Sequence, residues 1–101
     1  MPSNTTTLEE ILDTLRTHMP HLRERHAVRS IGVFGSYARG QQTNRSDLDL
    51  LVEFDDPPGL LEFIALENEL SDLLGVKVDL VTRNALRPRI GKRILEEVVM
   101  L

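Results

Sequence analysis

The sequence predicts an α/β (α+β) fold in which helices pack on a mixed β-sheet of three to four strands. Short apolar runs, some of them alternating with polar residues, predict strands, and longer segments with apolar residues every three to four positions predict helices. These segments follow one another in the order helix, strand, strand, helix, strand, helix. With 101 residues in total, residues 1–101 are expected to form a single domain around one modest core.

The first helix is expected to begin within a run of threonines. Residues 6–10, Thr-Thr-Leu-Glu-Glu, contain two overlapping Thr/Glu pairs with the spacing of a capping box. Apolar residues then recur at helical spacing as far as Met19. Pro20 is expected to end or kink this helix, with a second short turn running to about His26. The histidines are interpreted as surface residues, because no carboxylate obviously completes a metal site beside them.

Two strands are expected in the first half of the chain. Residues 28–34 form an apolar run, and residues 47–54 carry apolar side chains at every even position, which must face the core. Asp47 and Asp49 lie on the opposite face, because side chains alternate with a period of two. Between the strands, the pair Gly35-Ser36 is expected to open a helical turn. Backbone N–H groups and a hydroxyl at such a turn form a binding site for an anion.

The second half of the chain predicts a helix, a strand and a last helix. The first of these helices covers about residues 60–74 and stops at Gly75, and a strand follows over residues 76–81. The apolar side of that helix is expected to comprise Leu60, Phe63, Ile64, Leu66, Leu70, Leu73 and Leu74. The last helix begins near residues 86–89, and residues 98–101 form either its last turn or a short edge strand.

Composition excludes several classes of protein. The chain has no cysteine, which rules out disulfides and thiolate metal sites and suits a cytoplasmic protein. We expect no membrane association, since no apolar run could cross a bilayer and the N-terminus does not resemble a signal peptide. The net charge of −4 argues against stable, sequence-independent nucleic-acid binding. The basic segment 83–93 is interpreted as a solvated helix face or a docking surface for an acidic partner or polyphosphate.

Three carboxylates indicate metal-dependent phosphate chemistry. Asp79 stands alone in an apolar strand, where an acid needs a partner or a metal ion. If its strand lies beside strand 47–54, it converges with Asp47 and Asp49. Mg²⁺ prefers a few carboxylates together with water and phosphate oxygens, and a pair of such ions stabilises a displacement at phosphorus. Ser36 fits a phosphate ligand better than a nucleophile, because no histidine is placed to activate it.

The joint pattern resembles a known family. Gly35-Ser36, ten intervening residues and Asp47-Leu48-Asp49 resemble the motif of the DNA polymerase β-type nucleotidyltransferase superfamily. The longer string GSYARGQQTNRSDLDLLVEF is similar to its smallest branch, the minimal nucleotidyltransferases (MNT proteins) of bacteria and archaea. The resemblance extends over essentially the whole chain. It implies a nucleotidyltransferase fold, a single minimal nucleotidyltransferase domain, ATP as substrate and two Mg²⁺ ions.

The resemblance also assigns roles to individual positions. It implies that Asp47 and Asp49 ligate both metal ions, and that Asp79 binds one ion and helps to activate the acceptor hydroxyl. These three residues would therefore be both catalytic and metal-binding. The nucleotide-binding positions that it implies are Gly35, Ser36, Arg39 and Ser46.

The family resemblance suggests a partner protein, because so short a chain has no room for a separate acceptor-binding domain. MNT proteins are typically antitoxins paired with a HEPN-domain ribonuclease toxin. The resemblance implies a protein adenylyltransferase that transfers AMP from ATP to a toxin side chain, a tyrosine in the best-understood cases, and works in a hetero-complex or as a homo-oligomer. Two alternatives stay open. One is an antitoxin that covers its partner through residues 83–93 and 98–101 without catalysis. The other is a small-molecule nucleotidyltransferase whose pocket a second copy completes.

Overall fold

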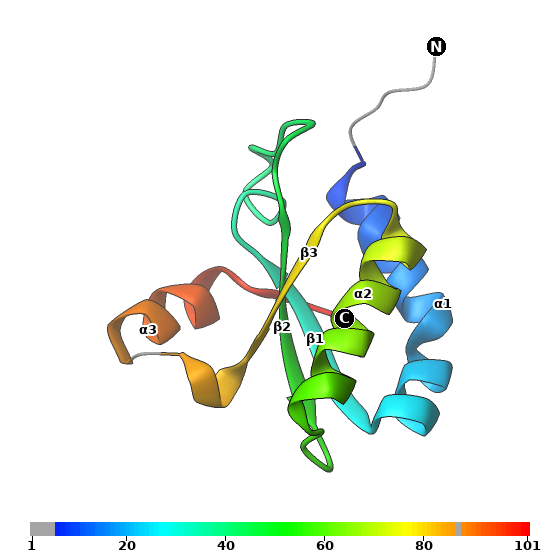
Figure 1. Cartoon of the computed structure of the whole chain (residues 1–101). Coiled ribbons are helices and arrows are strands. Elements are labelled where there is room, and N and C mark those ends of the chain that lie inside the picture. Colours follow the sequence, from blue (N-terminus) through cyan, green and yellow to red (C-terminus); the bar gives the residue numbers. More distant parts are fainter. Residues whose placement is uncertain (1–5, 87) are drawn as a thin grey trace.

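The computed structural model describes residues 6–86 and 88–101, apart from the side chain of Ile90. Its elements are α1 (Leu8–His26), β1 (Val28–Phe34), β2 (Leu48–Phe54), α2 (Leu60–Leu74), β3 (Val78–Thr82), the 3₁₀ turn η1 (Arg83–Ala85), α3 (Pro88–Glu97) and β4 (Val99–Met100). The four strands form one sheet in the order β3-β2-β1-β4 (Figure 1). β2 and β3 are parallel, and the other two pairs are antiparallel. The predicted mixed sheet and the order of its elements are therefore confirmed.

Helices cover both faces of the sheet. Figure 1 shows α1 and α2 together on one face and α3 on the other. The larger core lies under α1 and α2 and contains, among others, Ile11, Leu15, Leu22, Leu48, Leu50, Val52, Leu66 and Leu70. A smaller cluster under α3 joins Phe34, Leu51 and Ile94. The even-numbered face of β2 is core as predicted, while the opposite face is covered only in part, at Leu51.

The expectation that Pro20 ends the first helix is wrong. α1 runs without interruption through Pro20, with the buried side chains of Met19 and Leu22 on either side of it. Proline lacks one backbone donor, and the burial of these neighbours against the sheet outweighs that loss. Of the two expected caps, the pair Thr7 and Glu10 is used, since the Thr7 side chain accepts a hydrogen bond from the Glu10 N–H at 3.2 Å.

The apolar side of α2 is narrower than expected. Its fully buried residues are Leu66, Leu70 and Leu74. Leu60 and Ile64, which were expected on the same side, are 74% and 42% exposed. A straight helix buries only one stripe of side chains against a sheet, so an apolar surplus outside that stripe remains in solvent. The helix stops as predicted, with Gly75 in the left-handed conformation at φ 71°.

The last residues of the chain belong to the sheet. Val99 of β4 lies opposite Val33 of β1, and the N–H of Leu101 donates to the Ile31 carbonyl at 3.2 Å. Of the two expectations for residues 98–101, the edge strand is therefore confirmed.

The other edge of the sheet is closed by side chains of α2. The N–H of Val78 donates to the Ser71 hydroxyl at 3.0 Å, and the N–H of Leu80 donates to the Glu67 carboxylate at 2.8 Å. An edge strand with satisfied donors does not readily pair with a strand of another chain. The β3 edge is therefore closed to a further strand at these positions.

Candidate active site

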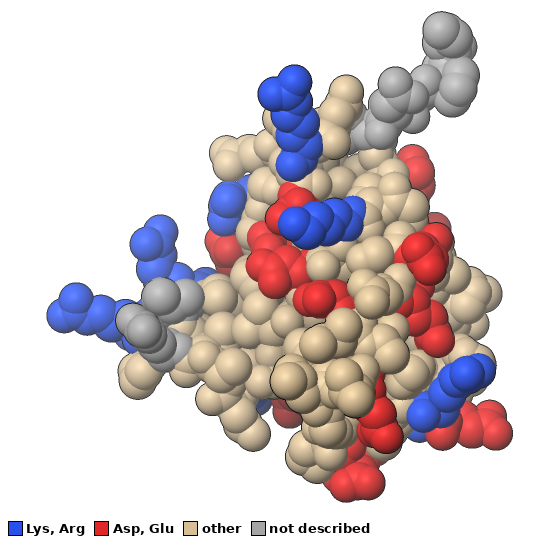
Figure 2. All heavy atoms as spheres, in the orientation of Figure 1, with Lys and Arg blue, Asp and Glu red and all other residues tan. Residues whose placement is uncertain are grey.

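The register of β2 and β3 brings the predicted carboxylates together. Asp49 lies directly opposite Asp79 in the parallel ladder, so both side chains project from the same face of neighbouring strands. Asp47 precedes Asp49 by two residues at the start of β2. In Figure 2, acidic side chains gather on the visible face over the part of the molecule where β2 begins, with basic side chains beside them. The proximity of Asp49 and Asp79 thus follows from the adjacency and register of β2 and β3.

Asp49 is the electrostatic centre of this group. Partial burial raises the pKa of Asp49, the nearby charges of Asp79 and Asp47 raise it further, and Arg39 opposes the increase. Asp47 and Asp79 are exposed. Asp49 therefore lies among carboxylates whose negative charge is only partly compensated, and a divalent cation would supply that compensation.

The donor set fits Mg²⁺ only when substrate oxygens complete it. Among residues 6–86 and 88–101, no group of three His, Asp or Glu side chains forms a ready-made metal site. Mg²⁺ binds through one or two carboxylates plus waters and substrate phosphates rather than through a closed protein cage. The carboxylate oxygens of Asp47, Asp49 and Asp79 therefore suit Mg²⁺ that arrives with a phosphate ligand.

The Gly35 turn lies against these carboxylates. Gly35 has a φ of +75°, which favours glycine, and a Cβ at this position would collide with the Asp49 carboxylate. After Gly35 the backbone makes a single helical turn, which does not continue as a helix. The turn is closed by a hydrogen bond from the Arg39 N–H to the Gly35 carbonyl at 3.2 Å. Within the described residues, the Ser36 hydroxyl makes no hydrogen bond, so it is available to a ligand.

Ser46, in contrast, uses its hydroxyl inside its own loop. The hydroxyl accepts a hydrogen bond from the Thr43 N–H at 2.9 Å, and the Ser46 N–H donates to the Thr43 carbonyl at 3.1 Å. These bonds close the turn just before Asp47. The structure therefore places Ser46 as a residue that shapes the approach to β2, at the border of the carboxylate group.

One acidic residue near the site was missed by the sequence analysis. Glu97, the last residue of α3, accepts a hydrogen bond from the Gly35 N–H at 3.1 Å. Both of its oxygens also accept from Nη1 of Arg39, at 3.2 Å each. No local pattern could have revealed this contact, because it depends on the pairing of β4 with β1 across more than sixty positions of sequence.

The tyrosine and histidine side chains take no part in this site. Tyr37 is buried in the core, which raises the pKa of its hydroxyl and confirms a packing role. His26 and His21 face Glu69, with Nε2 to Oε2 distances of 3.3 and 4.0 Å. The expectation that all three histidines are surface residues is wrong for His26, whose side chain is only 15% exposed. The contact joins α1 to α2, which are close in the fold and distant in sequence.

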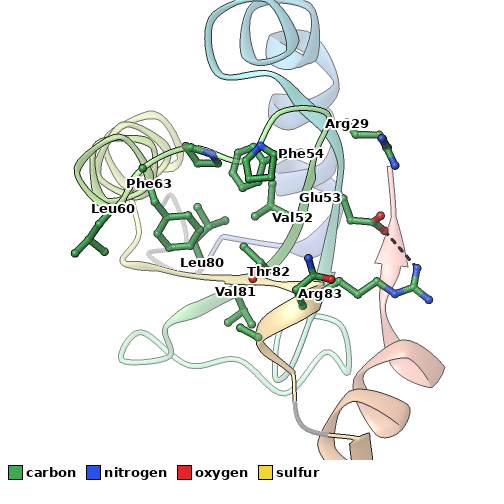
Figure 3. Close-up of a pocket in the computed structure, with 15 residues that line it drawn as sticks. Arg29, Val52, Glu53, Phe54, Leu60, Phe63, Leu80, Val81, Thr82 and Arg83 are labelled. Carbon is green, nitrogen blue, oxygen red and sulfur yellow. Dashed lines mark ion pairs between the residues drawn. The ribbon is translucent and has the colours of Figure 1, made fainter.

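The cavity in Figure 3 lies away from the carboxylates. Its volume is about 690 Å³, and apolar side chains such as Val52, Phe63 and Leu80 line it together with the ion pair between Glu53 and Arg83. Asp49 precedes Glu53 by four residues of β2, a separation of about 13 Å. A smaller cavity of about 270 Å³ borders the site itself and is lined by residues 43–47, among others. The larger cavity is therefore separate from the group of Asp47, Asp49 and Asp79.

Comparison with known proteins agrees with this geometry. Residues 15–101 match the family model of the nucleotidyltransferase domain. The protein adenylyltransferase MntA of Thermococcus cleftensis is 54% identical over 93 residues, which cover 92% of this chain and 94% of that protein.

None of the described helices is both long and apolar enough to cross a membrane.

Solved structures share the fold. One named as a minimal nucleotidyltransferase superposes with a TM-score of 0.79 at 39% identity. The match covers 98% of this chain and 100% of the chain in that structure. A chain in a crystal structure of a toxin–antitoxin with AMP-PNP superposes with a TM-score of 0.67 at 25% identity. The match covers 91% of this chain and 69% of that one. The chain therefore belongs to the nucleotidyltransferase domain family and has the fold of a minimal nucleotidyltransferase.

Proposed function

We propose that the chain is an Mg²⁺-dependent protein adenylyltransferase that transfers AMP from ATP to a side-chain hydroxyl of a partner toxin and thereby neutralises it. The observation that carries the proposal is the register of Asp49 opposite Asp79, with Asp47 two residues before and Gly35 packed against Asp49. The reaction needs alignment and charge neutralisation more than a covalent nucleophile. A group of carboxylates beside a small-residue turn supplies both.

The residues divide the work between nucleotide and metal. Ser36 and Arg39 bind the triphosphate, and Gly35 lets the backbone approach it closely. Asp47, Asp49 and Asp79 are the carboxylates that would hold the Mg²⁺ ions. The bound ions would neutralise charge on the attacking and leaving oxygens. Ser46 acts indirectly, by ordering the turn before Asp47.

Asp79 receives the proton of the acceptor. The acceptor oxygen forms a bond to the α-phosphorus of ATP. The bond from that phosphorus to the oxygen that bridges the α- and β-phosphorus breaks, and pyrophosphate leaves. The hydroxyl proton passes to the Asp79 carboxylate, which is exposed on the edge strand β3 and open to an incoming side chain. An acceptor on another protein requires such an open position.

The proposed partner is a HEPN-domain toxin with a tyrosine acceptor. The relative in Thermococcus cleftensis is named a protein adenylyltransferase, and the toxin–antitoxin neighbour was solved with the ATP analogue AMP-PNP. Both names support a nucleotide substrate and a protein acceptor. A cytoplasmic location follows from this role, since the toxin and ATP are both there.

Mass measurement of the toxin tests the proposal. The chain is co-expressed with a HEPN-domain toxin of the proposed kind, and the intact toxin is weighed by mass spectrometry. We expect mass increases in whole AMP units with the wild type and none with Asp49→Ala or Asp47→Ala. Asp72→Asn, which changes an exposed acid on α2, is the control and should transfer normally. Equal transfer by wild type and both site variants would refute the assignment.

The same variants test the non-catalytic alternative. The basic residues Arg89, Lys92 and Arg93 of α3 are exposed, which favours a contact with an acidic partner surface. If Asp49→Ala still protects cells fully from the toxin, covering suffices and chemistry is dispensable. Loss of protection by this variant, with unchanged binding to the toxin, supports catalysis.

A further inference from the structure

Glu97 connects the C-terminal segment to the Gly35 turn. Its carboxylate accepts a hydrogen bond from the Gly35 N–H at 3.1 Å. Each of its two oxygens also accepts from Nη1 of Arg39 at 3.2 Å. Gly35 and Arg39 are also joined to each other by a backbone hydrogen bond across the turn. One carboxylate therefore holds both ends of the turn that we propose binds the triphosphate.

The position of Glu97 is fixed from both sides. One turn before it, Ile94 is buried against Phe34 and Leu51 on the sheet. Directly after it, the N–H of Val98 donates to the Ile94 carbonyl at 2.8 Å, and Val99 pairs with Val33 in β4. The side chain of Glu97 is 32% exposed and has a rigid support beneath it. A carboxylate held in this way can hold its partners in place in turn.

Arg39 needs such support. Its side chain is 48% exposed and would otherwise sample many rotamers in solvent. Nη1 is bound to Glu97 and Nε donates to the Gln41 side chain at 3.2 Å, which orients the plane of the guanidinium. A guanidinium has five N–H donors in a fixed fork, so others remain for a phosphate.

We propose that Glu97 is a positioning residue for the nucleotide: it holds the Arg39 guanidinium and the Gly35 turn in the geometry that receives the triphosphate of ATP. The inference rests on the proposed function, and nothing in it requires Glu97 to touch the substrate. It makes the last turn of α3 and strand β4 part of the nucleotide site. The competing interpretation is that the Glu97 carboxylate occupies the place of a phosphate and opposes binding, which predicts the opposite sign.

Nucleotide affinity decides between the two. We would measure the Kd of Mg·ATP by titration calorimetry for the wild type and for Glu97→Ala, Glu97→Gln and Glu97→Asp. Positioning predicts that Kd rises on the order of tenfold in Glu97→Ala, because a charge-assisted contact that preorganises the site is lost. Glu97→Asp, which keeps the charge, should recover part of the affinity. Glu96→Gln, on an exposed neighbour in the same helix, is the matched control and should bind like the wild type.

A double-mutant cycle tests whether Glu97 acts through Arg39. In the Arg39→Ala background, Glu97→Ala should raise Kd by a smaller factor than in the wild type, since only its contact with the Gly35 N–H is left to be lost. In steady state, the single variant should raise KM for ATP more than it lowers kcat. Thermal melts identify variants that fail to fold, and Glu97→Gln, which keeps the shape of the side chain, then replaces Glu97→Ala.

The outcomes separate this inference from the proposed function. A wild type that binds Mg·ATP while all Glu97 variants bind equally well or more tightly overturns the positioning role and leaves the proposed function intact. Full, additive penalties in the Arg39→Ala background overturn the route through Arg39. A folded wild type that binds no Mg·ATP overturns both.

Discussion

Replacing Gly35 by alanine should separate stability from activity. Gly35 and Gly40 have nearly the same left-handed backbone, with φ of 75° and 69°. A Cβ on Gly40 meets no atom within 4 Å, whereas a Cβ on Gly35 runs into the carboxylate of Asp49. The variants Gly35→Ala and Gly40→Ala therefore share the backbone strain and differ in one contact. That contact involves the residue at the centre of the site.

The two effects have different sizes. A left-handed alanine costs about 1–2 kcal/mol of stability, so both variants should unfold at lower denaturant by a similar amount. In Gly35→Ala the Asp49 carboxylate must retreat by about 1 Å to reach ordinary van der Waals contact. It can do so by side-chain rotation, which adds little to the loss of stability. A displacement of that size in a reacting group can lower the rate about 100-fold.

The comparison needs two assays. Urea unfolding is followed by circular dichroism, because the chain has no tryptophan and a single tyrosine. Transfer of labelled AMP to the partner toxin is measured on the same preparations. We expect similar losses of stability, with transfer nearly abolished in Gly35→Ala and close to wild type in Gly40→Ala. Equal transfer by the two variants would show that the contact between Gly35 and Asp49 does not matter to the reaction.

Four further predictions follow from the same structure. Asp49→Asn should stabilise the fold. Because the pKa of Asp49 is raised in the folded state, ionisation of this carboxyl lowers the free energy of unfolding of the wild type as pH rises. In urea unfolding, the variant should therefore gain little free energy of unfolding over the wild type at about pH 4 and clearly more at pH 7. A gain that shrinks with rising pH would contradict this sign. Leu70→Ala should lower the free energy of unfolding by about 2–5 kcal/mol, whereas Leu61→Ala, on a side chain that is 82% exposed, should change it by less than about 0.5 kcal/mol. Thr7→Ala should remove the cap of α1 at a cost of about 1 kcal/mol, measured in the same way. Mg·ATP at 100 times its Kd should stabilise the wild type by about 2.7 kcal/mol in thermal melts and Asp49→Ala much less.

Local patterns predicted the elements whose side chains alternate or repeat strongly. β2 is the best example, because its even-numbered residues are apolar and its acids fall on the other face. The same alternation predicted the core and the direction of Asp49. The place of Asp79 followed once β2 and β3 were taken as neighbours, and their parallel register confirms that adjacency.

Features that depend on tertiary contacts were not predictable in the same way. Nothing local distinguishes Leu60, which stays exposed on α2, from Leu66, which is buried, because the position of the sheet decides which stripe is covered. Proline is a strong local signal against a helix, yet α1 continues through Pro20 because its neighbours are buried. In both cases burial against another element outweighs intrinsic propensity.

The carboxylate group and the apolar core depend on each other. Partial burial of Asp49 and the like charges around it raise its pKa and work against folding, so the strand that carries it must gain its stability elsewhere. β2 gains it on its other face, where Leu48 and Leu50 are fully buried under α1 and α2. Positive charge near the acids comes from Arg39, which contacts Glu97 at the end of α3, and from Lys77, whose Nζ lies 3.9 Å from Oδ2 of Asp47. Because both basic side chains are exposed, they compensate the acids only weakly, and a metal-bound nucleotide should stabilise the fold and the site together.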